Sequence, residues 1–218
     1  MLEPIHADAH LLVLSKPSGL LSVPGRGPDK QDCLSARAQA QWPDALIVHR
    51  LDMATSGLIV MARGPDMQRT LSMAFASRQV HKTYEAIVQG VLLQKTQSLQ
   101  GWDDIQIPLS IDWPNRPRSK IDWQQGKPSH TQWQVIPASS HPNSSGSATR
   151  VRLQPVTGRT HQLRLHMMAI GHPIWGDNLY APADVQALSP RLLLHACRLQ
   201  FVHPVTAQSL DLHSTVPF

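Results

Sequence analysis

The chain has 218 residues, of which 41% are hydrophobic and 16% charged, and its formal net charge is +5. This composition excludes a wholly disordered chain, which requires few apolar residues and dense charge. No apolar run approaches the roughly 18 residues of a membrane-spanning helix, and the two cysteines are too few for a disulfide framework. We therefore expect a cytoplasmic protein without a membrane partner.

The first half of the chain predicts mainly strands. Apolar, β-branched or alternating runs predict strands at 11–14, 46–48, 58–61 and 82–90, and the run at 20–23 is either a short strand or an ordered loop. Apolar residues at helical spacing predict helices at 32–41 and 65–77. The second of these begins at Pro65, and proline is well tolerated in a first helical turn.

The second half predicts loops and strands around one longer helix. Residues 90–126 are rich in tryptophan and proline, which indicates loops and short strands, and residues 137–147 read as a flexible surface connection. Further strands are predicted at 129–136, 148–154, 191–201 and 208–212, and a helix at 159–170 that ends before Gly171. Strands outnumber helices without strict alternation, so we expect an α+β fold with a mixed, largely antiparallel sheet flanked by helices and loops.

One polar loop is enclosed by two apolar strands, in the sequence VHRLDMATSGLIV. It carries His49, Arg50, Asp52, Thr55 and Ser56. Polar groups held at the ends of core strands suit catalysis. The same residue types also cap ordinary turns by bonding to backbone amides. Composition alone leaves both interpretations open.

A second polar cluster falls in the predicted helix and just after it. Arg164 lies about 140° around an ideal helix from Arg159, so one arginine can serve a buried carboxylate while the other meets a phosphate. His161 and His166 are five residues apart, whereas metal-ligand pairs on one helix favour a separation of three or four. No metal site is predicted.

Four segments, in order, carry a resemblance: VHRLDMATSGLIVMAR, KTYEAIVQG, GRTHQLRLHMMAIGHPIWGDNLY and RLLLHA. Together they resemble the successive motifs of the RluA family of pseudouridine synthases, over a region from Lys16 to about Phe201. The segments LLSVPGR and DWPNRP are similar to the dual-specificity member of that family. The resemblance implies one pseudouridine synthase catalytic domain over 1–218, without an S4 RNA-binding domain.

The implied reaction isomerises a uridine in RNA to pseudouridine with no cofactor and no metal. The implied partners are a tRNA anticodon stem-loop, modified at tRNA position 32, and 23S rRNA, modified at a hairpin uridine at rRNA position 746. A monomer is expected. Two other functions remain as alternatives: a non-catalytic RNA-binding or chaperone module of the same fold, and a nucleoside glycosidase that releases free uracil.

The resemblance also assigns the catalytic residues. Asp52 matches the essential aspartate, and three roles stay open: attack on the ribose C1′, addition to the base, or removal of the C2′ proton. All three require an ionised carboxylate beside the nucleotide. Arg164 is its expected ion-pair partner. Tyr84 is expected to stack on the uracil and place its hydroxyl for the proton at carbon 5.

Substrate-binding residues follow from the same motifs. Arg50 is expected to fill the space left by the flipped base, a step that costs a few kcal/mol. Leu193 and Leu194 are candidate apolar walls of the uracil pocket. The candidate phosphate contacts are Lys82, Arg116, Arg118, Lys120, Arg159 and Arg191.

Overall fold

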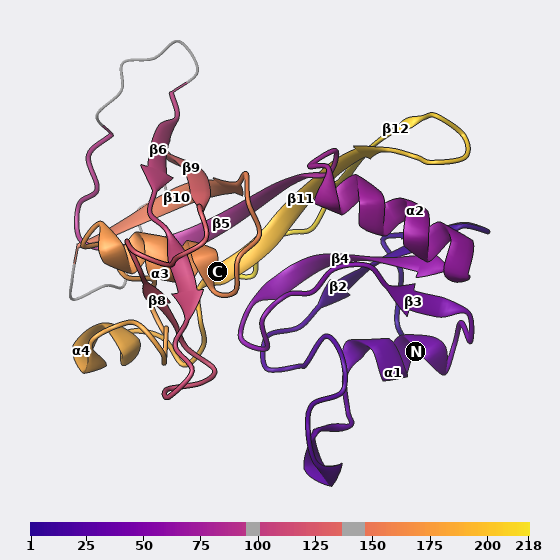
Figure 1. The fold of residues 1–218 in the computed structure, drawn as a ribbon, viewed down its shortest axis with the longest axis horizontal. Coiled ribbons are helices and arrows are strands. Elements are labelled where there is room, and N and C mark those ends of the chain that lie inside the picture. Colours follow the sequence, from indigo (N-terminus) through magenta and orange to yellow (C-terminus); the bar gives the residue numbers. More distant parts are fainter. Residues whose placement is uncertain (95–100, 137–146) are drawn as a thin grey trace. The chain divides into compact units, whose positions relative to one another are not determined.

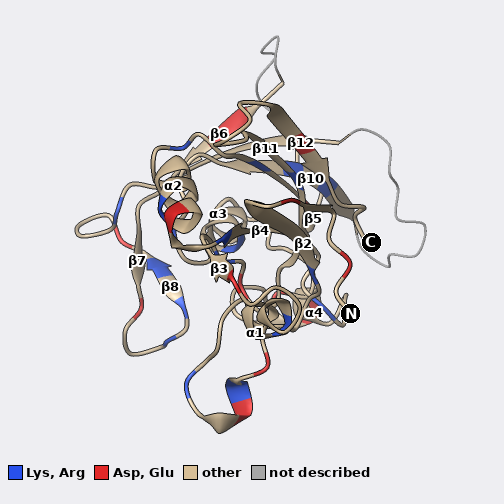
Figure 2. Ribbon diagram, turned by 90° about the vertical axis from the view of Figure 1, so that its right-hand side faces the viewer, with Lys and Arg blue, Asp and Glu red and all other residues tan. Residues whose placement is uncertain are grey.

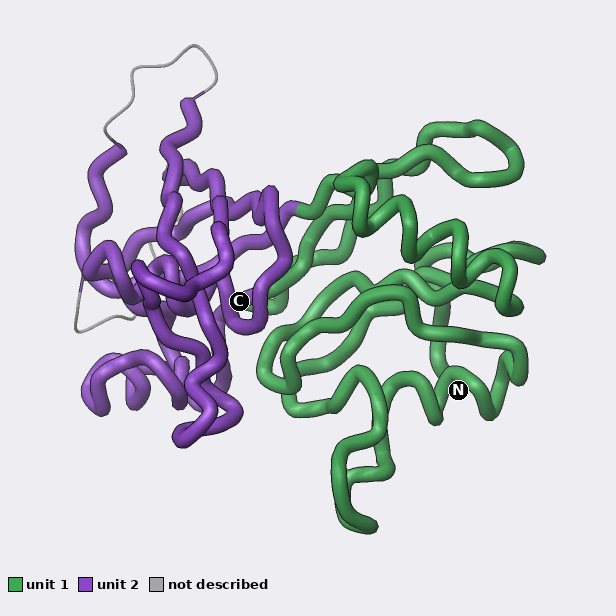
Figure 3. The backbone as a smooth tube through the Cα atoms, in the orientation of Figure 1, with its two compact units in different colours: residues 1–82, 195–218 green, residues 83–194 purple. Residues whose placement is uncertain are grey.

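A computed structural model describes residues 1–94, 101–136 and 147–218. It contains two compact units (Figure 3): unit 1 comprises Met1–Lys82 and His195–Phe218, and unit 2 comprises Thr83–Leu194. Except for Ser147, the predicted flexible connection lies outside the described residues. Folding of the chain as a single catalytic domain stays a prediction. No helix among the described residues is long and apolar enough to cross a membrane.

Unit 1 is a mixed sheet with helices on its two faces (Figure 1). Strand β4 pairs antiparallel with β2 and β3 and parallel with β11, while β1 and β12 add antiparallel to β2 and β11. The helix α2 covers one face and α1 the other. The elements are β1 (His6–Ala7), β2 (Leu11–Lys16), the 3-10 helix η1 (Pro28–Lys30), α1 (Leu34–Gln39), β3 (Ala45–Ile47), β4 (Ser56–Arg63), α2 (Pro65–Ala76), β11 (Leu194–Val202) and β12 (Ser209–His213).

The burial of the two central strands of unit 1 explains why their sequences are continuously apolar. Residues 11–14 of β2 and 58–62 of β4 are all buried, because both faces of the sheet are covered. Alternate side chains of these strands pack with Leu71 of α2 in one hydrophobic cluster, which also includes Leu199 and Phe201 of β11. The core therefore extends along β4, the strand that the polar loop leads into.

Unit 2 is built on antiparallel strands in the order β5, β10, β9, β6, with a separate β7–β8 hairpin. Helix α3 packs against β8, β9 and β10. The elements are β5 (His81–Gln89), whose first two residues belong to unit 1, β6 (Asp103–Gln106), β7 (Leu109–Ile111), β8 (Ser119–Ile121), β9 (His130–Val135), β10 (Ala148–Pro155), α3 (Gln162–Ala169) and α4 (Ala183–Gln186).

The α+β class and the largely antiparallel, mixed sheet are confirmed. The start of the long helix was predicted wrongly at Arg159. His161 has a left-handed backbone with φ of 55°, so α3 begins only at Gln162. The run at 20–23 is an ordered loop rather than a strand, with one bridge from Leu21 to Cys33. Neither β1 nor α4 was predicted, since each is too short to show a period.

Candidate active site

The loop that carries Asp52 begins where β3 ends. The imidazole Nε2 of His49 accepts a hydrogen bond of 2.9 Å from the backbone N–H of Val60. The ring also stacks on Phe75 of α2, with centroids 4.3 Å apart. The side chain of His49 thus adds one hydrogen bond between the start of the loop and β4, just after the end of β3. Burial, aided by the charge of Lys82, lowers the pKa of His49 to about 3, which keeps Nε2 available as an acceptor.

A buried lysine crosses from β2 to the same loop. Lys16 is completely inaccessible to solvent. Its ammonium donates to the carbonyl oxygens of Pro17 at 2.9 Å, Leu20 at 2.7 Å and Met53 at 3.1 Å. A buried charge is tolerated only when hydrogen bonds compensate its lost hydration. The ammonium therefore joins the segment after β2 to the residue that follows Asp52.

Further hydrogen bonds fasten the loop to residues 18–22. The Ser22 hydroxyl donates to the Leu51 carbonyl at 2.7 Å and accepts from the Leu51 N–H at 3.1 Å. The Ser18 hydroxyl donates to the Ala54 carbonyl at 2.6 Å. The N–H of Gly19 donates to the Met53 carbonyl at 2.8 Å. The backbone on both sides of Asp52 is therefore fixed, as a positioned catalytic side chain requires.

The loop ends on β4 beside β11. Ser56 Oγ and His195 Nδ1 share a buried hydrogen bond of 2.8 Å. Gly57 has φ of 115°, and a Cβ at this position would overlap the backbone of Ala196. Only glycine permits this close approach of β4 to β11. The TSG sequence after Asp52 thus serves backbone packing.

The polar loop contains both buried and accessible residues. Ser56, Gly57 and Thr55 are buried and bonded within the fold, whereas Asp52 is half-buried and Arg50 is exposed. Asp52 and Arg50, which are predicted to meet the nucleotide, are thus accessible, as is Met53. Asp52 and Arg50 belong to unit 1, whereas Tyr84 and Arg164 belong to unit 2.

Arg164 is held rigidly in unit 2 by Asp177. Its Nε donates to Asp177 Oδ2 at 2.8 Å and its Nη2 to Oδ1 at 2.6 Å. The two side chains are 3% and 1% exposed. Asp177 Oδ1 also accepts from the backbone N–H groups of Leu179 and Tyr180. The buried carboxylate that the structure gives Arg164 is therefore that of Asp177. The predicted pairing of Arg164 with Asp52 stays a prediction.

An aromatic residue lies next to Arg164. The guanidinium carbon is 5.3 Å from the ring centroid of Tyr180. The Tyr180 hydroxyl accepts from the N–H of Ser119 in β8 and bonds to His161 Nδ1, each at 2.8 Å. Tyr84 is buried in β5, opposite Leu153 of β10.

The other predicted substrate-binding residues differ in their surroundings. Leu193 and Leu194 are both buried. Burial lowers the pKa of Lys82 and of Arg191, so these two cations are less solvated than surface ones. Arg116, Arg118, Lys120 and Arg159 are exposed, and Figure 2 shows basic residues along the β7–β8 hairpin. Arg159 lies in the loop before α3 rather than on the helix.

Three residues with clear structural roles were not singled out from the sequence: Lys16, Asp177 and Tyr180. Lys16 only marks the start of the region of resemblance, and Asp177 and Tyr180 lie in one of the matching segments without an assigned role. The signal that was available is a lone lysine at the end of a strand that begins with four apolar residues, which is unusual for a buried position unless its charge is bonded. Across residues 1–94, 101–136 and 147–218, no group of three or more His, Cys, Asp or Glu side chains is arranged to hold a metal.

Solved structures with the same arrangement define the class of this fold. Human RNA Pseudouridylate Synthase Domain Containing 1 matches with a TM-score of 0.79 and 26% identity, covering 100% of this chain and 84% of that one. Human RNA Pseudouridylate Synthase Domain Containing 4 matches with a TM-score of 0.71 and 25% identity, covering 98% and 88%. The fold is that of a pseudouridylate synthase.

The family model described as RNA pseudouridylate synthase matches residues 10–169. Relatives named "Dual-specificity RNA pseudouridine synthase RluA" are 46% identical in Pasteurella multocida, covering 100% of this chain and 94% of that protein, and 43% identical in Escherichia coli, covering 98% and 93%. The chain belongs to the RNA pseudouridylate synthase family and, within it, to the RluA family. It is accordingly an isomerase that makes pseudouridine in RNA.

Proposed function

We propose that this enzyme modifies two RNAs: a tRNA anticodon stem-loop, at position 32, and a 23S rRNA hairpin, at position 746. The relatives that match nearly the whole chain carry a dual-specificity name, and the segments LLSVPGR and DWPNRP resemble the dual-specificity member. The enzyme acts as a monomer in the cytoplasm, as one catalytic domain. It needs no cofactor or metal, because the reaction is an internal exchange of bonds.

The reaction breaks one bond of the nucleoside and makes another. The bond from N1 of uracil to C1′ of the ribose is cleaved, the base turns within the site, and carbon 5 bonds to C1′. The proton displaced from carbon 5 leaves, and N1 ends protonated, so mass and charge do not change. The site must therefore hold a detached base, supply a carboxylate and move one proton.

Asp52 is the proposed carboxylate. Its loop is fixed by the ammonium of Lys16 and the hydroxyls of Ser18 and Ser22, while Asp52 itself stays half-buried. This contrast is the observation that carries the proposal, because a loop used only as a turn has no need of such bracing. An ionised carboxylate suits attack on C1′, addition to the base or removal of the C2′ proton.

Arg164 is the proposed partner of that carboxylate. Asp177 orients the guanidinium through Nε and Nη2, and in this proposal the same guanidinium also meets the Asp52 carboxylate. A nearby guanidinium favours the ionised form of a carboxyl group and opposes the effect of burial. Tyr84 is the proposed platform for the uracil, with its hydroxyl as the group that handles the proton of carbon 5.

The remaining residues are proposed to hold the RNA. Arg50, exposed beside Asp52, fills the gap that the flipped uridine leaves in its hairpin. Leu193 and Leu194 form apolar walls for the uracil. The basic residues Lys82, Arg116, Arg118, Lys120, Arg159 and Arg191 are proposed phosphate contacts, so binding weakens as salt rises.

Pseudouridine mapping tests the proposal. Wild-type protein is incubated with an unmodified anticodon stem-loop or 23S hairpin, and carbodiimide-dependent primer-extension stops are mapped. We expect stops at both target uridines and no free uracil by chromatography. Asp52→Asn should abolish the stops while RNA binding persists, and Asp29→Asn, at an exposed aspartate of η1, should leave them unchanged. Wild-type protein that modifies neither RNA would overturn the substrate assignment, and active Asp52→Asn would remove Asp52 from its role.

A further inference from the structure

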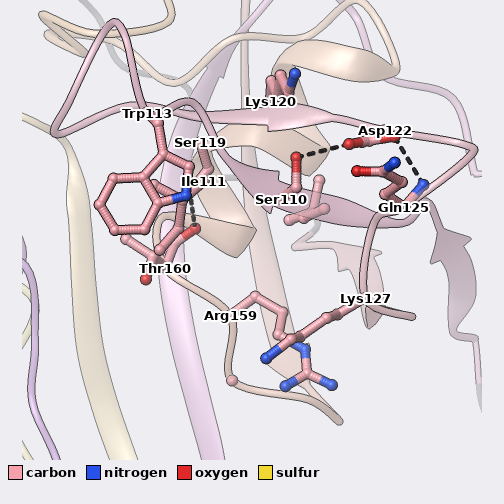
Figure 4. A pocket seen from close by; sticks show the side chains of 12 residues that line it. Ser110, Ile111, Trp113, Ser119, Lys120, Asp122, Gln125, Lys127, Arg159 and Thr160 are labelled. Atoms are coloured by element: carbon pink, nitrogen blue, oxygen red, sulfur yellow. Dashed lines mark hydrogen bonds between the residues drawn. The ribbon is translucent and has the colours of Figure 1, made fainter.

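Unit 2 contains a pocket of about 590 Å³ at the β7–β8 hairpin. Its walls come from both strands, from the turn after β8 and from the loop before α3 (Figure 4). The volume falls within the range of about 300–1,000 Å³ typical of small-ligand sites. The wall residues used below are Ser110, Trp113, Ser119, Lys120, Lys127 and Arg159.

The charge of this pocket favours an anion. Lys120, Lys127 and Arg159 bring three cations to its walls, against the single carboxylate of Asp122. That carboxylate is occupied internally, since it accepts from the N–H groups of Gln124 and Gln125 and from the Ser110 hydroxyl. The same bonds lower the pKa of Asp122. The net charge of the pocket walls is therefore positive, and a phosphate group suits such a site.

An aromatic surface stands at the same pocket. The Trp113 side chain is 63% exposed, and the turn that carries it is held by contacts with Arg116 and Arg118. The Asp112 N–H donates to the Arg118 carbonyl at 3.0 Å, and the Arg116 guanidinium lies 4.5 Å from the Trp113 ring centroid while its Nε donates to the Trp113 carbonyl. An indole held in one orientation offers a base a stacking surface at little entropic cost.

The pocket is connected to Arg164 within unit 2. Ser119 in its wall donates its N–H to the Tyr180 hydroxyl and its own hydroxyl to the Thr160 carbonyl at 3.1 Å. Tyr180 in turn contacts the Arg164 guanidinium. Direct contacts thus join the wall of the pocket to Arg164 through Tyr180.

We propose that this pocket binds one unpaired nucleotide of the substrate RNA other than the target uridine, with its base stacked on Trp113 and its phosphate beside Lys127 and Arg159. The inference rests on the proposed function in that it takes the ligand to be RNA. A base–indole stack requires a base that is out of its helix, so paired nucleotides are not accepted. The pocket therefore selects hairpins by an unpaired position beside the target.

Two exposed tryptophans provide a matched pair of variants. Trp123 is 73% exposed on the turn after β8 and does not line the pocket. The dissociation constant for the anticodon stem-loop and for the 23S hairpin should rise about ten-fold in Trp113→Ala, in line with loss of one base stack. Trp113→Phe should stay within about three-fold of wild type, and Trp123→Ala should match wild type. Thermal unfolding by circular dichroism establishes that each variant is folded.

Abasic substitution identifies the nucleotide. Hairpins with one abasic residue at each unpaired position in turn are titrated with wild type and Trp113→Ala. At one position the wild type should lose about ten-fold in affinity while Trp113→Ala loses nothing further, since both changes remove the same stack. The Lys127→Ala, Arg159→Ala double variant should lower the slope of log Kd against log salt by about one, as expected for loss of one or two phosphate contacts.

The outcomes separate this inference from the proposed function. Two results would show that the pocket does not hold a nucleotide. One is that Trp113→Ala binds both hairpins as tightly as Trp123→Ala does. The other is that the loss of affinity in Trp113→Ala adds fully to the loss of affinity caused by an abasic residue at every position. Wild-type pseudouridine formation on the same hairpins then still supports the proposed function. If wild type modifies neither hairpin but binding depends on Trp113, the pocket inference stands and the substrate assignment fails.

Discussion

Arg164 and Asp177 form a two-point ion pair that is almost completely withdrawn from solvent. Arg198 and Asp211 form the same two-point pair at the surface, with side chains 39% and 41% exposed. The same two-point pairing of arginine with aspartate therefore occurs both in the interior and at the surface. The buried pair fixes the direction of a proposed catalytic arginine, while the exposed pair links β11 to β12.

Asp177→Asn should be far more damaging than Asp211→Asn. Breaking a buried pair leaves an uncompensated charge and costs about 3–5 kcal/mol of unfolding free energy, whereas an exposed pair contributes about 1 kcal/mol or less. Urea unfolding measures both losses. We also expect pseudouridine formation to fall at least ten-fold in Asp177→Asn and to be unchanged in Asp211→Asn. Equal losses of stability in the two variants would contradict the role given to burial.

Tyr84→Phe should separate the two proposed uses of this side chain. The ring stays to stack on the uracil, but the hydroxyl that handles the proton of carbon 5 is lost. Loss of a positioned acid–base group lowers rates by about 10²–10⁴-fold. Single-turnover kinetics should show this fall with the RNA dissociation constant unchanged. A variant with normal turnover would exclude the hydroxyl from proton transfer at carbon 5 and leave Tyr84 with the stacking role alone.

Sequence reasoning located the polar loop and most elements correctly, because they depend on local patterns. The apolar runs of β2 and β4 and the period of α2 are properties of neighbouring residues. The start of α3 was missed because the left-handed backbone of His161 is set by its tertiary surroundings, which include the Tyr180 hydroxyl. Composition does not reveal such an interruption.

The fixed environment of Asp52 was harder to predict than Asp52 itself. Lys16 lies 37 residues from Met53, whose carbonyl it binds, and Asp177 lies 13 residues from Arg164. No spacing rule joins such pairs, since the fold brings them together. The HRLD and TSG segments were informative because they matched a family pattern. Of the residues that brace them, Ser18 and Ser22 carry no local signal, and Lys16 shows only its charge at the end of an apolar strand.

The stability of the protein should fall in acid through His49. Its folded pKa of about 3 lies below the ordinary value of 6.5, so between these values the unfolded chain binds a proton that the folded chain does not. The free energy of unfolding therefore decreases as pH falls from 6.5 toward 3, by at most about 1.4 kcal/mol per pH unit from this group. His49→Gln should reduce that slope.

Denaturant unfolding at pH 7, 6, 5 and 4 measures the slope, and His81→Gln serves as the control because His81 is exposed at the start of β5. Its slope should equal that of wild type. An unchanged slope in His49→Gln would show that His49 is not the group that resists protonation.

Gly57→Ala and Gly64→Ala should differ although both glycines have positive φ. Gly64 has φ of 83° and open space where a Cβ would lie, whereas a Cβ at Gly57 would overlap Ala196. Left-handed strain alone costs about 1–2 kcal/mol, and overpacking adds about 1–3 kcal/mol. Thermal melting should show the larger loss in Gly57→Ala. Equal melting temperatures would mean that β11 yields to the added methyl group.

The Lys16 ammonium makes residues 16–22 and 51–54 a single opening unit. The amide hydrogens of Gly19 and Leu51 are donated across these two segments, to the Met53 carbonyl and the Ser22 hydroxyl. Neither amide reaches deuterated water unless the segments part, and that separation removes the Met53 carbonyl from the ammonium. Both amides should therefore exchange at one common rate. The loop that presents Asp52 would then open only together with the segment that follows β2.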